Sequence, residues 1–89
     1  MNGKHIKVYG RVQGVGFRFF TAQFAKKHNI VGTVENVDDY VEIYASGDEH
    51  HLEQFVDGVI KGVAPASIVE SYTVDDTTLE DNMKHFKTL

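Results

Sequence analysis

The sequence predicts an α+β fold in which two helices lie together on one face of a four- to five-stranded antiparallel sheet. The hydrophobic period changes along the chain in the order βαββαβ. Only two segments show helical spacing in a chain of 89 residues. Two short helices cannot cover both faces of a sheet, so we expect them to pack side by side on one face.

The first strand and the first helix are expected on either side of a glycine-rich junction. Apolar and polar residues alternate from Lys4 to Val12, which predicts a strand. Residues 17–28 predict a helix, because apolar residues recur there at spacings of three and four. The apolar positions of this helix are Phe17, Phe20, Phe24 and Ala25.

A hairpin is expected next. Residues 30–37 are rich in β-branched side chains, and residues 41–45 alternate again, so each segment predicts a strand. Asp38 and Asp39 separate the two segments and indicate a tight turn.

The second half of the chain predicts a helix followed by one or two strands. Asp48 and Glu49 suit the positive N-terminal end of that helix, and the stretch from Ser46 to Glu49 fits a capping box. Residues 67–76 predict the fourth strand, and residues 83–89 a short terminal strand or a docked tail. The complete order is that of a ferredoxin-like sandwich. The apolar positions of the second helix are Leu52, Phe55, Val56, Val59 and Ile60.

Length and composition indicate a single domain over residues 1–89. A chain this short buries only about 60 to 65% of its unfolded surface around one core. The sequence has no cysteine, no apolar run long enough to cross a membrane, and no apolar signal-peptide region at its start. We therefore expect a cytoplasmic monomer with no membrane partner.

The charges are unevenly distributed along the chain. The formal net charge is −4, which argues against nucleic acid as a partner. All 13 acidic residues lie between Glu35 and Asp81, whereas the first 29 residues carry only basic charges. Because both arginines, Arg11 and Arg18, fall in the glycine-rich junction, we interpret this region as a positive field for a small anion rather than only a solvated face.

The junction GRVQGVGFRFF, from Gly10 to Phe20, has the features of a phosphate-binding loop. A strand that ends in glycines and leads into a helix directs backbone N–H groups and the positive end of the helix dipole toward one point. Gly14 and Gly16 permit the tight turn, and the planar guanidinium of Arg18 can bind two phosphate oxygens. A turn whose glycines serve packing alone is the alternative.

Spacing excludes several other glycine motifs. The loop lacks the third glycine of a dinucleotide-binding turn and the Lys-Ser/Thr pair of a P-loop. Phosphatases with a cysteine nucleophile carry it six residues before the loop arginine, where this chain has Val12. No covalent phosphoenzyme is expected, which leaves water as the nucleophile.

Two segments, Val8–Arg18 and Gly32–Gly47, resemble the two signatures of the acylphosphatase family. The resemblance covers the whole chain and implies hydrolysis of acyl phosphates to a carboxylate and inorganic phosphate, the latter also an expected inhibitor. It implies no cofactor and no metal. It assigns catalysis to Arg18 and Asn36. The phosphate-binding residues that it implies are Gln13, Gly14, Val15, Gly16, Phe17 and Arg18.

The residue types suggest different catalytic roles for Arg18 and Asn36. Arg18 would stabilise the transferred phosphoryl group, since such groups spread charge over their oxygens in the transition state. Asn36 cannot act as a general base, because a carboxamide does not titrate, but its oxygen can accept a hydrogen bond from water. We therefore expect Asn36 to orient the attacking water.

Two other functions remain open from the sequence. A regulatory or carrier domain that binds a phosphorylated metabolite without turnover would use the same loop. An RNA-binding module would use Tyr40 and Tyr44 on the open sheet face, although Glu42 stands between them. The five histidines lack the spacing of metal ligands.

Overall fold

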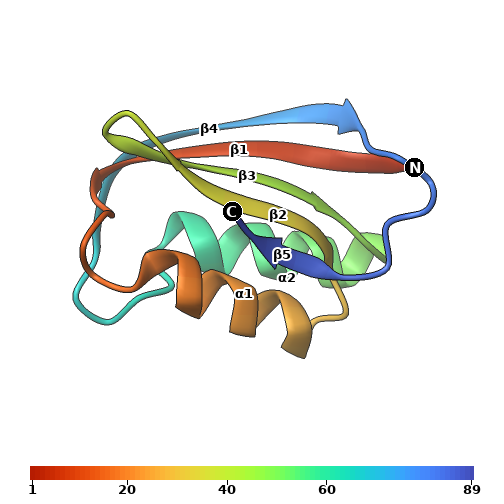
Figure 1. Ribbon diagram of the computed structural model, residues 1–89, viewed down its shortest axis with the longest axis horizontal. Helices are drawn as coiled ribbons and strands as arrows, with labels where there is room; N and C mark the ends of the chain where they lie inside the picture. The colour runs from red at the N-terminus through yellow and green to blue at the C-terminus, as the bar shows by residue number, and fades with distance from the viewer.

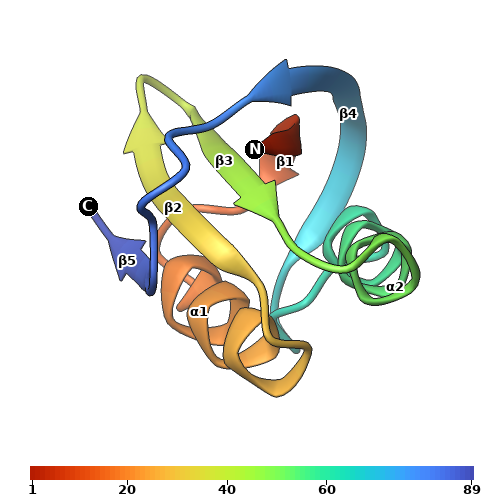
Figure 2. The same cartoon turned by 90° about the vertical axis from the view of Figure 1, so that its right-hand side faces the viewer.

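The seven elements form two layers, a five-stranded sheet and a pair of helices on one of its faces (Figures 1 and 2). The computed structural model describes all 89 residues. The helices are α1 (Phe17–Lys27) and α2 (Glu49–Ile60). The strands are β1 (Asn2–Arg11), β2 (Val31–Val37), β3 (Tyr40–Ser46), β4 (Ile68–Thr78) and β5 (Phe86–Thr88). Every predicted helix and strand is present, so the ferredoxin-like prediction is confirmed.

The sheet differs from the prediction in one respect, because it is mixed. Its strand order is β4-β1-β3-β2-β5, and the pairs among β1 to β4 are antiparallel. β5 pairs with β2 in parallel, so the expectation of a purely antiparallel sheet is wrong. The reason is topological. The chain leaves β4 at the end of the sheet where β2 begins, so the next strand on the β2 edge must run in the direction of β2.

The N-terminus holds the segment in which the chain passes from β4 to β5. The Met1 amino group donates a hydrogen bond to the Leu79 carbonyl at 2.7 Å and forms an ion pair with Asp81. The Leu79 N–H donates in return to the Met1 carbonyl at 2.8 Å. The ammonium holds the pKa of the Asp81 carboxyl below its usual range, through hydrogen bonding and charge. These contacts fasten the chain where it leaves β4.

The hydrophobic core lies between the sheet and the helices. On β1, Ile6 and Val8 are fully buried, while Lys7 between them points to the open face, as the alternation predicts. On the helices, Phe17 and Phe55 are the largest fully buried side chains. The ring of Phe24 stacks on Phe55 with 5.8 Å between ring centroids, which joins α1 to α2.

Helix α2 begins differently from the predicted capping box. Ser46 still belongs to β3, and its hydroxyl donates to the Asn2 carbonyl at 2.5 Å. Asp48 is the N-cap, and its carboxylate accepts a hydrogen bond from the His51 N–H at 3.4 Å. Ser46 therefore joins β3 to β1, and Asp48, two residues later, caps the helix in its place. Neither helix is both long enough and apolar enough to cross a lipid bilayer.

The turn from β1 to α1 depends on left-handed backbone. Gly14 has φ 74° and Gly16 has φ 77°, in the region that side chains disfavour. A Cβ atom added to Gly14 would meet no atom within 4 Å. The need for glycine at position 14 therefore comes from the backbone conformation and not from lack of space.

Truncation of Phe55 should lower stability strongly. Phe55→Ala removes a fully buried ring between the helices, and we expect a loss of about 3–5 kcal/mol in the free energy of unfolding, measured in urea. Phe19→Ala is the matched control, because Phe19 is 58% exposed, and it should cost under about 1 kcal/mol. Equal losses in the two variants would contradict this account of the core.

Gly14 offers a test of the turn. We expect Gly14→Ala to lower the free energy of unfolding by about 1–2 kcal/mol, because the Cβ atom of alanine makes a left-handed backbone conformation sterically unfavourable. Gly14→Asn should lose less, since asparagine tolerates this region better. If thermal and urea denaturation find the alanine variant as stable as the parent, the turn does not require a positive φ.

Candidate active site

A cavity of about 310 Å³ lies where the β1–α1 loop, β2 and β5 meet. The loop and the β2–β3 hairpin lie at the same end of the molecule (Figure 1). The residues that line the cavity are Val12, Gln13, Gly14, Gly16, Phe17, Arg18, Phe19, Asn36 and Thr88. Both predicted catalytic residues are thus brought together, although 18 positions of sequence separate Arg18 from Asn36.

The start of α1 presents unpaired backbone donors to this region. The first hydrogen bond of the helix runs from the Phe20 N–H to the Gly16 carbonyl at 3.0 Å. The N–H groups from Gly14 to Phe19 donate to no backbone carbonyl. No side chain caps the helix, and its first turn contains no acid. These N–H groups and the positive helix end are therefore available to an anion.

Arg18 reaches from the first turn of α1 across to β5. Its Nη1 donates to the backbone oxygen of Leu89 at 2.9 Å. No aspartate or glutamate side chain forms an ion pair with Arg18. A guanidinium has five N–H donors in a plane, so this one contact leaves donors for a ligand in the cavity.

Asn36 lies near the end of β2 on the side of the sheet that carries the helices. It follows the parity of the buried Val34, and the intervening Glu35 pairs with Glu42 on the open face. The Asn36 Oδ1 atom is buried and has no hydrogen-bond partner. Buried polar atoms without a partner are uncommon in proteins, and here the acceptor belongs to a side chain that lines the cavity.

Gln13 ties the loop to the hairpin that carries Asn36. Its Nε2 donates to the Asp38 and Tyr40 carbonyls, each at 3.0 Å. The two bonds bridge the β2–β3 turn, where Asp38 has a positive φ of 50°. The side chain of Gln13 therefore sets the separation of the loop from β2, while its position in the loop borders the cavity.

The structure places all but one of the predicted site residues on this cavity. Val15 does not line the cavity and packs partly against the core, and Arg11 is exposed and lies outside the cavity. The prediction omitted Val12, Phe19 and Thr88 as lining residues. Val12 and Phe19 flank the predicted loop, so proximity in sequence could have found them. Thr88 arrives through the pairing of β5 with β2, for which the sequence carries no local signal.

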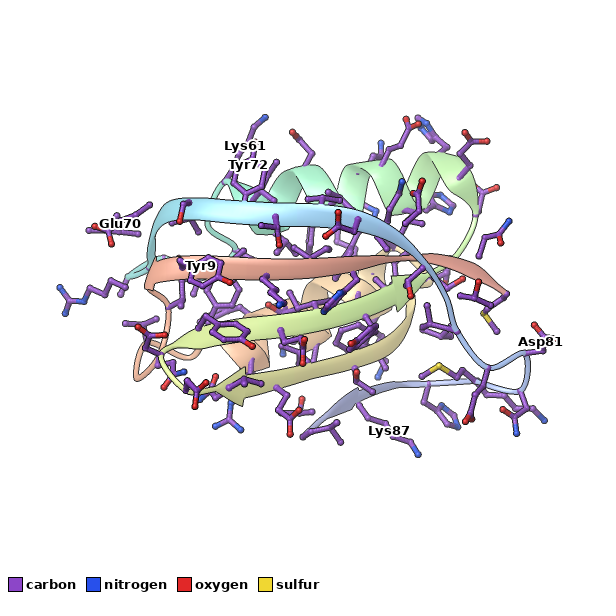
Figure 3. All side chains as sticks on the ribbon, turned by 90° about the horizontal axis from the view of Figure 1, so that it is seen from above. Tyr9, Lys61, Glu70, Tyr72, Asp81 and Lys87 are labelled. Carbon is purple, nitrogen blue, oxygen red and sulfur yellow. The ribbon has the colours of Figure 1, made fainter.

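The open face of the sheet carries aromatic pairs away from this cavity (Figure 3). His5 stacks on Tyr44 with 4.3 Å between ring centroids, and Tyr9 contacts Tyr40 at 5.1 Å. Burial raises the pKa of the Tyr40 phenol above its ordinary value. Tyr40 and Tyr44 thus share the outward face as predicted, with their rings already covered by neighbours. No group of three or more His, Asp or Glu side chains could hold a metal ion.

Comparisons with known proteins indicate the family of the chain. Residues 4–88 match the family described as Acylphosphatase. The chain is 52% identical to an acylphosphatase of Staphylococcus haemolyticus (strain JCSC1435) over 89 residues, which is 100% of both chains. Its structure is similar to the crystal structure of an acylphosphatase from Bacillus subtilis, with a TM-score of 0.91 and 40% identity over 100% of this chain and 99% of the other.

A longer protein contains a similar unit. The structure of full-length HypF in the phosphate- and nucleotide-bound form matches with a TM-score of 0.90 and 30% identity, over 99% of this chain and 12% of that chain. The match of the family over residues 4–88 and the full-length relative carry the assignment. The chain belongs to the acylphosphatase family, a family of enzymes named for the hydrolysis of acyl phosphates.

Proposed function

We propose that this chain hydrolyses the carboxyl-phosphate anhydride of acyl phosphates by direct attack of water on phosphorus. The products are a carboxylate and inorganic phosphate. The observation that carries this mechanism is that Asn36 and Arg18 line the same cavity, while the Asn36 Oδ1 atom makes no hydrogen bond inside the protein. An acceptor in this position suits a water molecule held beside a bound phosphoryl group.

The phosphoryl group would lie against the β1–α1 loop. The N–H groups from Gly14 to Phe19 are unpaired, and Arg18 adds a planar cation with free donors. Phosphoryl transfer proceeds through a transition state whose charge is spread over three oxygens, so positioning and charge stabilisation supply most of the catalysis. Arg18 and the loop supply both.

Asn36 would orient the nucleophile. Its Oδ1 accepts a hydrogen bond from the attacking water, so that the water oxygen faces phosphorus as the bond to the acyl oxygen breaks. The leaving carboxylate is a weak base and departs without a proton. The proton of the water passes to the phosphate that forms. No general base is needed, and no His, Asp or Glu lines the cavity to provide one.

A covalent phosphoenzyme has little support at this site. Val12 occupies the position where a nucleophilic cysteine would precede the loop arginine, and the sequence has no cysteine. Thr88 is the one hydroxyl side chain that lines the cavity. No titratable base accompanies it there, and an unactivated hydroxyl is a poor nucleophile.

Binding of a phosphorylated metabolite without turnover is the second candidate. The unpaired amides and Arg18 would serve such a domain equally well, and a structurally similar unit occurs within HypF, a protein solved with phosphate and nucleotide bound. A domain that only binds has no use for a buried acceptor that holds water. The buried Asn36 Oδ1 therefore favours hydrolysis.

Loss of the arginine fork should nearly abolish activity. We expect Arg18→Ala to lower kcat/KM for benzoyl phosphate by at least about 10²- to 10³-fold, since one preorganised donor is worth that much and a charged fork more. Arg18→Lys should also be badly impaired, because an ammonium cannot bind two oxygens in a plane. Arg11→Ala is the matched control and should keep the parental rate, because Arg11 lies outside the cavity. Similar rates in the Arg18→Ala and parent proteins would contradict the proposed role.

Loss of the Asn36 carboxamide should lower turnover and leave phosphate binding unchanged. We expect Asn36→Ala to lower kcat for benzoyl phosphate about 100-fold or more, while inorganic phosphate still inhibits competitively with an unchanged inhibition constant. Asn82→Ala removes an exposed carboxamide outside the cavity and serves as the control. The water-orienting role is wrong if the Asn36 variant retains the parental kcat.

A further inference from the structure

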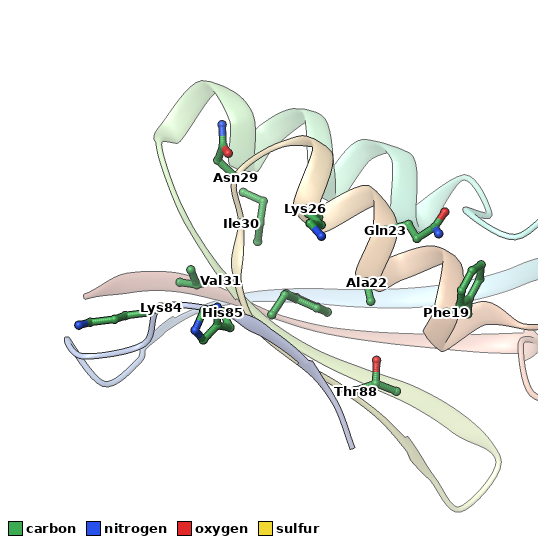
Figure 4. A pocket seen from close by; sticks show the side chains of 11 residues that line it. Phe19, Ala22, Gln23, Lys26, Asn29, Ile30, Val31, Lys84, His85 and Thr88 are labelled. Atoms are coloured by element: carbon green, nitrogen blue, oxygen red, sulfur yellow. The ribbon is translucent and has the colours of Figure 1, made fainter.

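A second, larger cavity begins beside the candidate active site and follows α1 (Figure 4). It has a volume of about 600 Å³ and lies between α1 and the segment that contains β5. Phe19 and Thr88 line both cavities, so the two are neighbours. The residues that line this groove are Phe19, Ala22, Gln23, Lys26, Asn29, Ile30, Val31, Lys84, His85, Phe86 and Thr88.

The charges of the groove are all of one sign. Lys26 and Lys84 line it together with His85, and no acidic residue does. Neither lysine forms an ion pair within the chain. This is notable in a protein with 13 acidic residues and a net charge of −4. The groove is therefore electrostatically suited to a negatively charged occupant.

Lys84 and His85 lie at the end of the groove away from the phosphate loop, and Lys26 lies midway along the α1 wall. In Figure 4, Phe19 and Thr88 mark one end and Lys84 and His85 the other. From Phe19 to Lys26 the helix rises about 10 Å, at about 1.5 Å per residue. From Lys84 to Thr88 the chain covers about 13 Å, at about 3.3 Å per residue of extended chain. Along both walls, the backbone of a lysine thus lies about 10 to 13 Å from the residues that the groove shares with the active site.

Both walls contribute apolar side chains between the two ends. Phe19, Ala22 and Phe86 come from the two sides of the groove and can contact a hydrocarbon chain. Phe19 is 58% exposed, although large aromatic side chains are usually well buried. An apolar passage that ends in cations matches a carbon chain that ends in an anion.

We propose that this groove receives the acyl part of the substrate and favours acyl groups that carry a second anionic group, a carboxylate or a phosphate, within about 10 to 13 Å of the transferred phosphoryl group. The proposal rests on the proposed function, because it assigns the leaving group of that reaction to the groove. The phosphoryl group occupies the loop, the carbon chain passes Phe19 and Thr88, and the terminal anion meets Lys26 and Lys84. Acyl phosphates of dicarboxylic acids are the simplest members of this class.

The test compares two acyl phosphates of equal chain length, adipoyl monophosphate, which ends in a carboxylate, and hexanoyl phosphate, which ends in a methyl group. We expect the parent protein to show the higher kcat/KM with adipoyl monophosphate. The double variant Lys26→Gln with Lys84→Gln should reduce this ratio roughly three- to tenfold, since each exposed ion pair is worth up to about fivefold. A third substrate that ends in phosphate distinguishes the two kinds of anion.

Lys27→Gln supplies the matched control. Lys27 is exposed and belongs to the same last turn of α1, but it does not line the groove. Its replacement removes the same charge and should leave the ratio of the two substrates unchanged. Added NaCl should lower the preference in the parent protein and have little effect in the double variant, because salt screens exposed charges.

The outcomes separate this inference from the proposed function. Turnover of hexanoyl phosphate with no preference for adipoyl monophosphate would overturn the assignment of the groove and leave the proposed function intact. A preference that survives in the double variant, or that falls equally in the Lys27 control, would also overturn it. Absence of turnover with both substrates would overturn the proposed function together with the inference.

Discussion

The site depends on backbone N–H groups at the start of α1 that have no carbonyl partner inside the protein. Every α-helix begins with such donors, and most proteins satisfy them with a capping side chain or water. Here the left-handed glycines at positions 14 and 16 turn the chain from β1 into α1 without providing a cap. The donors from Gly14 to Phe19 remain available, and the rest of the site is arranged around them.

Two side chains connect this helix start to the rest of the sheet. Gln13 joins the loop to the β2–β3 turn, which sets the position of Asn36. Arg18 joins the first turn of α1 to the backbone of Leu89 beyond β5. Each connection uses a side chain to bridge segments that are distant in sequence. The cavity is therefore held by polar contacts at the rim of a fold whose stability comes from the core beneath it.

The fold keeps acidic side chains out of the active-site cavity and the groove beside it. The protein is acidic overall, yet no aspartate or glutamate lines the cavity that contains Arg18 or the neighbouring groove that contains Lys26 and Lys84. Glu35 adjoins Asn36 in sequence, but strand alternation directs it to the open face beside Glu42. Strand geometry thus keeps negative charge on one face of the sheet while an anion can approach the other side.

The order of elements, the identity of the core residues and the glycine-rich turn before α1 were predictable from the sequence, because each depends on local spacing. Periods of two and about 3.6 residues reveal which faces are apolar, and glycines followed by an arginine reveal a helix start suited to an anion. Local spacing did not predict the cap of α2 correctly. Ser46 bonds to Asn2 on the neighbouring strand, and Asp48 caps the helix instead. The tertiary structure alone decided three other features. These are the parallel pairing of β5 with β2, the position of Thr88 in the same cavity as Asn36, and the groove that Lys26 and Lys84 line together. These features join residues that are distant along the chain, and their positions follow from where the chain crosses the end of the sheet, for which no short stretch of sequence carries a signal.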